Sequence, residues 1–484
     1  MKLVLSLCAM LAGAGLAAAA TGPDYKRPAA NLPPAYDEKT APEIRWKPAE
    51  PSADKTRGAW WETFGDESLN QLEHDAGQSN FEVAAAVARL AQARASANVV
   101  RADFWPSVDL SGGATRQRPS ENRDLNGYPA HGTRIYNDFT AGLTLGWELD
   151  LWGRVRRASE ASVAQFRASA ADLASLRLLI EAETASDYFA LRALDSDLGL
   201  LRSNLVAQTR ALELVRNRRV GGLGTDLDVA EAETRVRETE AQIPASELSR
   251  ARLGHALASL TARTPAQLSV EARPLNANPP IVTAGIPAEL LERRPDVASA
   301  EQRMIAANAS IGVAKAAFFP TFRIGGLAGF DSLDAGSVFS WPSRLWSIGP
   351  GVTMPIFEGQ RLTGRLKLAQ AVHAEAEANY KQIVLSAVQE VEDNLSAQRL
   401  LAAQQSAEEL ATESANRALA ISLNRYQSGL TTYLDVATAL TTVLDRERAV
   451  AELRGQRHVA AVSLIKALGG GWDPVSATFA KVAK

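Results

Sequence analysis

Few residues in this chain have the spacing that catalysis or metal binding requires. The single cysteine, Cys8, can support neither a disulfide framework nor a cysteine-based zinc site. The histidines are scattered, and none forms a close helical pair: His74, His131, His255, His373 and His458. No nucleophile with a neighbouring base, phosphate-binding loop or metal-ligand cluster is recognisable. We therefore expect no enzyme, no cofactor and no metal.

The charge balance also excludes a nucleic-acid partner. The chain carries 52 lysines and arginines against 55 aspartates and glutamates, for a net charge of -3. Phosphate binding would need a basic surface. At 484 residues and 46% hydrophobic content, the chain is long enough for two or three domains or one large repetitive one.

The N-terminus is typical of an export signal. Lys2 precedes an almost wholly apolar or small run over residues 3–16, and residues 17–20 are all alanine. We expect residues 1–20 to be a signal peptide, with an N-terminal membrane anchor as the alternative. No later segment resembles a transmembrane helix, so entry into a membrane would require β-strands.

Several landmarks occur twice in the same order, roughly 207 residues apart. Residues 218–223 are echoed by 425–430, and Leu-Asp-Val-Ala at 227–230 recurs at 434–437. Upstream, residues 102–106 match 316–320. Such duplication predicts two structural repeats, each with a helix, a strand pair and a long helical hairpin.

The hairpins have the pattern of coiled coils. We expect a first helix over 66–100, and then a helix over 154–219, which contains no proline and only Gly199. This second helix would be about 100 Å long. Its leucine seam has alternating spacings of three and four: Leu191, Leu194, Leu198, Leu201 and Leu205. Taken alone, this pattern favours a purely structural coiled coil.

Between the helices the hydrophobic period changes to two. Apolar residues alternate over 107–112 and 140–149, and again over 321–325 and 348–356. Transmembrane strands need about 9–11 residues with one lipid-facing side. Soluble hairpins are the alternative, but the signal peptide and the duplication favour the membrane. Four strands cannot close a barrel, so several chains must combine, and a hollow duct favours at least three.

Three segments resemble the TolC/OprM-like outer-membrane factors, in particular the efflux-associated, NodT-type lipoprotein branch. They are residues 22–28 (Gly-Pro-Asp-Tyr-Lys-Arg-Pro), Trp60-Trp61 with Phe64-Gly65-Asp66, and residues 290–297 (Leu-Leu-Glu-Arg-Arg-Pro-Asp-Val). The resemblance implies a mainly α fold with β-strands. It also implies a homotrimer with a twelve-stranded transmembrane β-barrel, continued by a twelve-helix periplasmic α-barrel.

The resemblance further implies the outer-membrane channel of a tripartite, RND-type efflux system. A periplasmic adaptor (membrane fusion) protein would link it to the inner-membrane pump and meet the helical tips. The tip residues are Gly221, Gly222, Leu223, Ser428, Gly429 and Leu430. The duct of a protein-secretion system and a non-porous periplasmic scaffold remain alternatives.

By position in the same family, Asp228, Asp435 and Tyr426 correspond to gate residues that close the pore. The tyrosine would form a hydrogen bond with Asp228. A ring of carboxylates at a narrow mouth favours cations. The alternative is that both aspartates cap helices or lie in turns. The sequence departs from the family pattern at Thr431 and Thr438, where TolC-like proteins have arginine and aspartate.

Another departure concerns the lipid anchor, because Ala19 stands where the branch usually has a cysteine. We therefore expect a chain without a lipid, cleaved near residues 19–20. The expected organisation places an N-terminal extended segment at 21–65, repeats at 66–285 and 286–468, and a tail at 469–484. The strand pairs would lie within 107–149 and 321–356.

Overall fold

The computed structural model describes residues 21–28, 58–118, 120, 135–280, 282 and 294–470. The expected signal peptide, including Cys8 and Ala19, lies outside the described residues. So do residues 290–293 of the family motif and residues 471–484 of the expected tail. The chain forms two compact units. Unit 1 comprises Met1–Pro28, Leu90–Ser169 and Ala300–Tyr380, and unit 2 comprises Ala29–Arg89, Ala170–Ser299 and Lys381–Lys484.

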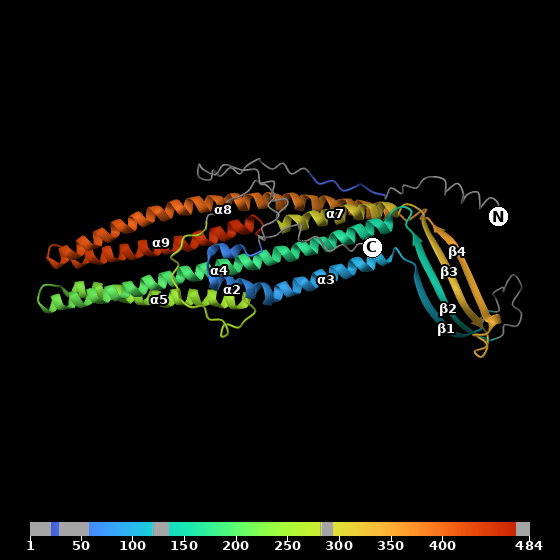
Figure 1. The fold of residues 1–484 in the computed structure, drawn as a ribbon, viewed down its shortest axis with the longest axis horizontal. Coiled ribbons are helices and arrows are strands. Elements are labelled where there is room, and N and C mark those ends of the chain that lie inside the picture. The colour runs from blue at the N-terminus through green and yellow to red at the C-terminus, as the bar shows by residue number, and fades with distance from the viewer. Residues whose placement is uncertain are drawn as a thin grey trace. The chain divides into compact units, whose positions relative to one another are not determined.

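Unit 1 contains an antiparallel sheet in the order β1-β2-β3-β4 (Figure 1). The strands are β1 (Ser107–Gln117), β2 (Tyr136–Leu149), β3 (Thr321–Ser332) and β4 (Arg344–Thr353). Gly142 pairs with Gly329 across β2 and β3, and a Cβ on Gly329 would approach the Ala141 carbonyl oxygen. Glycine is therefore needed where these strands approach each other closely. Residues 354–356, which were expected in the last strand, follow β4, because Pro355 has no N–H for a ladder hydrogen bond.

The segment 21–28 packs against helices of unit 1 and forms hydrogen bonds with them. These helices are α7 (Pro295–Ala316) and the first turns of α4 (Arg154–Val220). Arg27 pairs with Glu301 through two hydrogen bonds of 2.6 and 2.7 Å, and Asp24 accepts a hydrogen bond from Arg157. Gly22 and Gly312 lie so close that a Cβ on Gly22 would be 2.6 Å from the Gly312 Cα.

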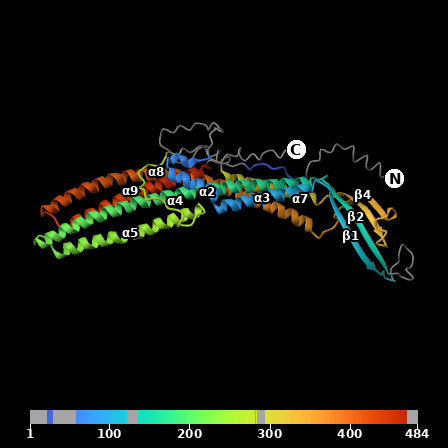
Figure 2. The same cartoon turned by 60° about the horizontal axis from the view of Figure 1, so that its bottom comes forward.

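Unit 2 contains most of two helical hairpins of equal lengths. In the first, α4 has 67 residues and α5 (Asp226–Leu260) has 35. In the second, α8 (Arg361–Gln427) has 67 residues and α9 (Tyr433–Ala467) has 35. The two turns lie at the same end of their hairpins (Figures 1 and 2). The internal repeat is thus a repeat of hairpins. No described helix is long and apolar enough to cross a membrane.

The single helix expected over 66–100 is instead two helices, α2 (Glu67–Ser79) and α3 (Phe81–Ala102). Asn80 separates them with an extended backbone. Its Oδ1 accepts hydrogen bonds from the N–H groups of Glu82 and Val83, and its Nδ2 donates to the carbonyl oxygen of Leu260. Asn80 therefore caps α3 and also fixes the end of α5, so a continuous helix is broken at this point.

Candidate functional site: the paired hairpin tips

The turn after α4 closes the helix with a left-handed glycine. Gly222 has a φ of 75°, a conformation that side chains with a Cβ rarely adopt. Its N–H donates to the carbonyl oxygen of Arg219 at 3.1 Å, and the N–H of Leu223 donates to that of Arg218 at 2.8 Å. Gly221 donates to the Asn217 carbonyl at 3.0 Å. These bonds form a Schellman motif, which satisfies the final carbonyl groups of the helix.

The turn after α8 repeats this geometry. Gly429 has a φ of 73° and donates to the carbonyl oxygen of Tyr426 at 3.0 Å. Leu430 donates to the Arg425 carbonyl at 2.9 Å, and Ser428 to the Asn424 carbonyl at 3.1 Å. The residues expected to contact an adaptor thus lie in two turns with one backbone structure.

Both turns expose apolar side chains. Val220 is 89% exposed, and the leucines that follow the two turn glycines, Leu223 and Leu430, are 73% and 70% exposed. Leu227 and Leu434, in the first turns of α5 and α9, are also exposed. Clustered exposed apolar residues at the end of a long hairpin are typical of a protein–protein contact surface.

Asp228 lies at the N-terminus of α5, where it forms a capping box with Thr225. Its Oδ2 accepts hydrogen bonds from the backbone N–H of Thr225 at 2.9 Å and from the Thr225 hydroxyl at 2.8 Å. The Asp228 N–H donates to the Thr225 hydroxyl oxygen at 3.1 Å. Within one chain, this aspartate therefore has the helix-capping role that the sequence left open as the alternative.

Asp435 occupies the equivalent position in α9 and is exposed to solvent. Its Oδ2 accepts hydrogen bonds from the hydroxyl groups of Thr431 and Thr432, the latter at 3.3 Å. The hydrogen bond from Thr431 lowers the pKa of the Asp435 carboxyl below its ordinary value. Thr431, which departs from the family pattern, therefore helps to keep this carboxylate charged.

Tyr426 is buried beneath the two turns, with 5% of its surface exposed. Its ring packs edge-on against Tyr433 at 5.8 Å between centroids. The hydrogen bond expected from Tyr426 to Asp228 is not formed within the chain, because no described residue pairs with the Tyr426 hydroxyl and Asp228 already bonds to Thr225. Burial raises the pKa of the Tyr426 hydroxyl.

Arg218 connects the two tips, a role that the sequence analysis did not assign to it. Its guanidinium carbon lies 4.6 Å from the centroid of the Tyr426 ring. Nη1 donates to the carbonyl oxygens of Tyr426 at 2.9 Å and Gln427 at 3.3 Å. The only sequence signal was the recurrence of arginine at positions 218 and 425.

The two turns differ in the pair of side chains that spans each of them. In the first turn, Arg219 and Asp226 form a two-bonded ion pair, with Nε–Oδ1 at 2.7 Å and Nη2–Oδ2 at 3.0 Å. The equivalent positions in the second turn hold the buried pair Tyr426 and Tyr433. The first turn is therefore spanned by a solvent-exposed ion pair. The second is spanned by two buried aromatic rings, and Arg218 packs against one of them.

Comparison with known proteins gives consistent results along the whole chain. A family model described as "Outer membrane efflux protein" matches residues 72–263 and 286–470. Outer membrane protein OprJ of Pseudomonas aeruginosa is 32% identical over 477 residues, which cover 98% of this chain and 97% of OprJ. The pyoverdine export outer membrane protein OpmQ of the same species is 32% identical over 416 residues, which cover 86% of this chain and 87% of OpmQ.

Solved structures agree with the sequence comparisons. The outer-membrane channel OprN superposes with a TM-score of 0.84 at 31% identity, and the match covers 93% of this chain and 99% of OprN. The family and these relatives are channels rather than enzymes. Among the described residues, no group of three or more His, Cys, Asp or Glu side chains is placed to hold a metal ion.

Proposed function

Because the chain belongs to the outer membrane efflux protein family and is an outer-membrane efflux channel, we propose that three copies assemble into the duct of a tripartite pump. The family resemblance is confirmed. The four-stranded sheet supports a trimer, because within the chain β1 and β4 each pair on one side only. Unpaired strand edges in lipid cost several kcal/mol per group, and three sheets would provide twelve strands for closure.

We propose the same chain organisation as the sequence suggests. Residues 66–285 and 286–468 would be the two repeats, with the signal peptide at 1–20, the extended segment at 21–65 and the tail at 469–484. The equal lengths of the two hairpins support this division.

The hairpin tips are the proposed docking surface for a periplasmic adaptor, which would connect the channel to an inner-membrane RND pump. The observation that carries this assignment is the pair of matching Schellman turns with exposed apolar side chains. A helical partner could place its own apolar residues against Leu223 and Leu430, because two equivalent turns offer two equivalent contacts.

Asp228, Asp435 and Tyr426 are the proposed gate residues at this same end. Asp435 is exposed and held in its charged form, which suits a cation-attracting constriction. Asp228 would have to leave Thr225 to reach a tyrosine on another copy. The gate would therefore exchange a capping box within one chain for a hydrogen bond between chains.

The proposed cargo is small molecules. The names of relatives mention pyoverdine and toluene, which are cargoes of those proteins. A protein-secretion duct would also be a hollow trimer, whereas a non-porous scaffold would not conduct ions. Electron microscopy of the detergent-extracted protein should show a hollow threefold cylinder, and a solid rod or a water-soluble monomer would refute the duct.

Cysteine cross-linking tests the docking surface. Leu223→Cys and Leu430→Cys should each form cross-links to the cognate adaptor in cells. Leu333→Cys is the matched control, because Leu333 is another well-exposed leucine, which follows β3 within unit 1. Cross-links at Leu333 alone, or at none of the three positions, would contradict adaptor docking at the tips.

A further inference from the structure

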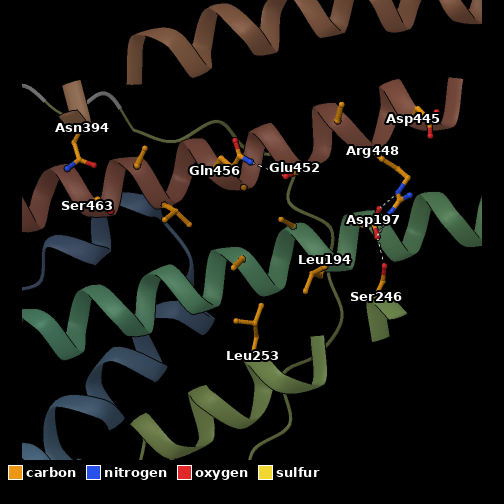
Figure 3. Close-up of a pocket in the computed structure, with 16 residues that line it drawn as sticks. Leu194, Asp197, Ser246, Leu253, Asn394, Asp445, Arg448, Glu452, Gln456 and Ser463 are labelled. Atoms are coloured by element: carbon orange, nitrogen blue, oxygen red, sulfur yellow. Dashed lines mark hydrogen bonds and ion pairs between the residues drawn. The ribbon is translucent and has the colours of Figure 1, made fainter. Parts of the chain in front are cut away.

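Two apolar cores join the hairpins of unit 2. One lies at the tips and includes Tyr426, and the other includes Phe189 of α4 and Val462 of α9. Asp197 of α4 and Arg448 of α9 belong to neither core, and along their helices they lie between the two. They line a cavity of about 820 Å³ among the helices (Figure 3). Helices that face a cavity lose van der Waals contacts, so polar contacts become more important for holding them together there.

Arg448 and Asp197 form an ion pair between the two hairpins. The Nε of Arg448 donates to Oδ1 of Asp197 at 2.5 Å, and Nη2 donates to Oδ2 at 3.4 Å. Figure 3 shows the two side chains extending toward each other from α9 and α4. Both side chains are partly buried, so solvent and salt screen this pair less than a pair on an open surface. The ion pair therefore holds α9 against α4.

Helix α5 contacts the same ion pair on both sides of Pro244. The Oε1 of Gln242 accepts a hydrogen bond from Nη1 of Arg448 at 2.9 Å, and the Ser246 hydroxyl donates to Asp197 at 2.7 Å. Pro244 has no N–H, so α5 lacks one of its own hydrogen bonds at this point. The ion pair thus connects α9 to both helices of the first hairpin, at the position where α5 is weakened.

A close approach of α9 and α4 lies beside this cluster. A Cβ on Gly455 would be 2.5 Å from the Cβ of Ala193, so the helices can approach this closely only because position 455 is glycine. Toward the tips along α9, Arg448 lies about 10 Å from Gly455, and Tyr433 lies about 33 Å from it. If the helices pivot at Gly455, a separation at Arg448 becomes roughly threefold larger at the tip, in proportion to these lengths.

We propose that Arg448 is a positioning residue for the proposed gate. Its contacts with Asp197 and Gln242 fix the distance between the hairpins, and this distance determines whether Arg218 reaches Tyr426 at the tips. Loss of the ion pair would let the hairpins separate and would weaken the tip contact without any substitution at the tip. This inference rests on the proposed duct and its gate, because only in a duct does the position of the tips control passage.

The variant Arg448→Met tests this role, because methionine keeps a long flexible side chain but removes the charge. We expect several-fold higher single-channel conductance of the full-length protein in planar bilayers, the same direction as for Arg218→Ala. Arg448→Lys should conduct at an intermediate level, because an ammonium group can still pair with Asp197 but lacks the planar fork.

Arg446→Met is the matched control. Arg446 lies on the same helix, and its Nη1 donates to both carboxylate oxygens of Glu408 of α8 at 3.0 Å. This ion pair lies within one hairpin and is partly buried, as the Arg448 pair is. Arg446→Met should lose a similar amount of thermal stability and should conduct like the unaltered protein.

The double variant Arg218→Ala/Arg448→Met shows whether Arg448 acts through the tip contact. Substitutions that affect one shared interaction are not additive, so the double variant should conduct no more than Arg218→Ala. Three outcomes would each overturn the proposal: additive increases in the double variant, an unchanged conductance in Arg448→Met, or equal increases in Arg448→Met and Arg446→Met.

Spin labels at Leu223 and Leu430 of one chain measure the separation of the hairpins without any need for conductance. The distance between the labels, measured by pulsed electron paramagnetic resonance with labelled chains diluted among unlabelled ones, should be larger in Arg448→Met than in Arg446→Met. A protein that conducts in no variant refutes the proposed duct. A label distance that Arg448→Met leaves unchanged refutes the positioning role alone.

Discussion

Arg218 of the first hairpin caps the end of α8 in the second hairpin and lies against Tyr426, with its guanidinium carbon 4.6 Å from the ring centroid. One side chain thus satisfies carbonyl oxygens at a helix C-terminus, where positive charge is favourable, and also makes a cation–π contact. The two hairpins of one chain are joined at their tips by this arginine. A gate that opens by moving one hairpin against the other must break this contact.

Replacement of Arg218 by alanine should weaken the contact between the two hairpin tips. The loss of a cation–π contact and of charged hydrogen bonds should cost about 1–3 kcal/mol. We expect a several-fold higher single-channel conductance in planar bilayers and lower thermal stability. Arg218→Lys should give an intermediate result, because an ammonium group can replace the charge but not the planar fork. Unchanged conductance in Arg218→Ala would show that this contact does not restrain the proposed gate.

The two turn glycines should not tolerate side chains. Gly222→Ala and Gly429→Ala force a positive φ on a residue with a Cβ, at a cost of about 1–2 kcal/mol each. A Cβ on Gly222 would meet open space, so the penalty there is purely conformational.

Gly221→Ala is the matched control, because its Cβ would make ordinary contacts with the Asn217 carbonyl oxygen and its φ is not positive. The melting temperature of Gly222→Ala should be lower than that of the unaltered protein, whereas Gly221→Ala should melt at the same temperature as the unaltered protein. Equal losses of thermal stability in Gly221→Ala and Gly222→Ala would contradict the left-handed cap at Gly222.

The charge state of Asp435 should depend on Thr431. The hydroxyl of Thr431 lowers the carboxyl pKa, so Asp435 keeps its charge to a lower pH than an ordinary aspartate. Thr431→Val should raise this pKa towards its usual value. The cation preference that we propose for the channel should then disappear at a higher pH as the solution is acidified.

Reversal potentials across a pH series would measure this change. Thr438→Val is a suitable control, because the Thr438 hydroxyl donates to the Leu434 carbonyl oxygen instead of to Asp435. If Thr431→Val and the unaltered protein lose selectivity at the same pH, the Thr431 hydroxyl does not control the charge of Asp435 in the proposed gate.

The sequence predicted the regular elements better than the contacts between them. Helical periodicity, the absence of proline and the repeated glycines placed the hairpins and their turns, because those signals are local. The break at Asn80 was missed, since it depends on a hydrogen bond to Leu260, far away in the chain. The Arg218–Tyr426 contact was missed for the same reason. Asp228 illustrates a further limit, because the same residue type suits both a capping box and a gate.

The buried carboxyl of Glu73 should make the protein less stable as pH rises. Glu73 is 1% exposed, and neither of its carboxyl oxygens has a hydrogen-bond partner among the described residues. Burial, and then the negative charge of Glu181, raise its pKa to about 10. Burial also raises the pKa of Glu181 to about 7, although Trp60 donates a hydrogen bond to it at 3.1 Å.

A raised carboxyl pKa means that the folded state binds more protons than the unfolded state. The stabilisation from neutral Glu73 is therefore complete below the ordinary glutamate pKa of about 4.3 and declines as pH rises through the folded-state pKa. Glutamine has the shape of a neutral glutamate but does not ionise, so Glu73→Gln should remove this decline. At pH 8 the melting temperature of the variant should be several degrees higher than that of the unaltered protein. At pH 5 the two melting temperatures should be nearly equal. Glu213→Gln, the control, removes an exposed carboxyl from α4 and should leave the melting temperature unchanged at both pH values. A Glu73→Gln melting curve that shows the original pH dependence would mean that Glu73 is not the group that takes up the proton on folding.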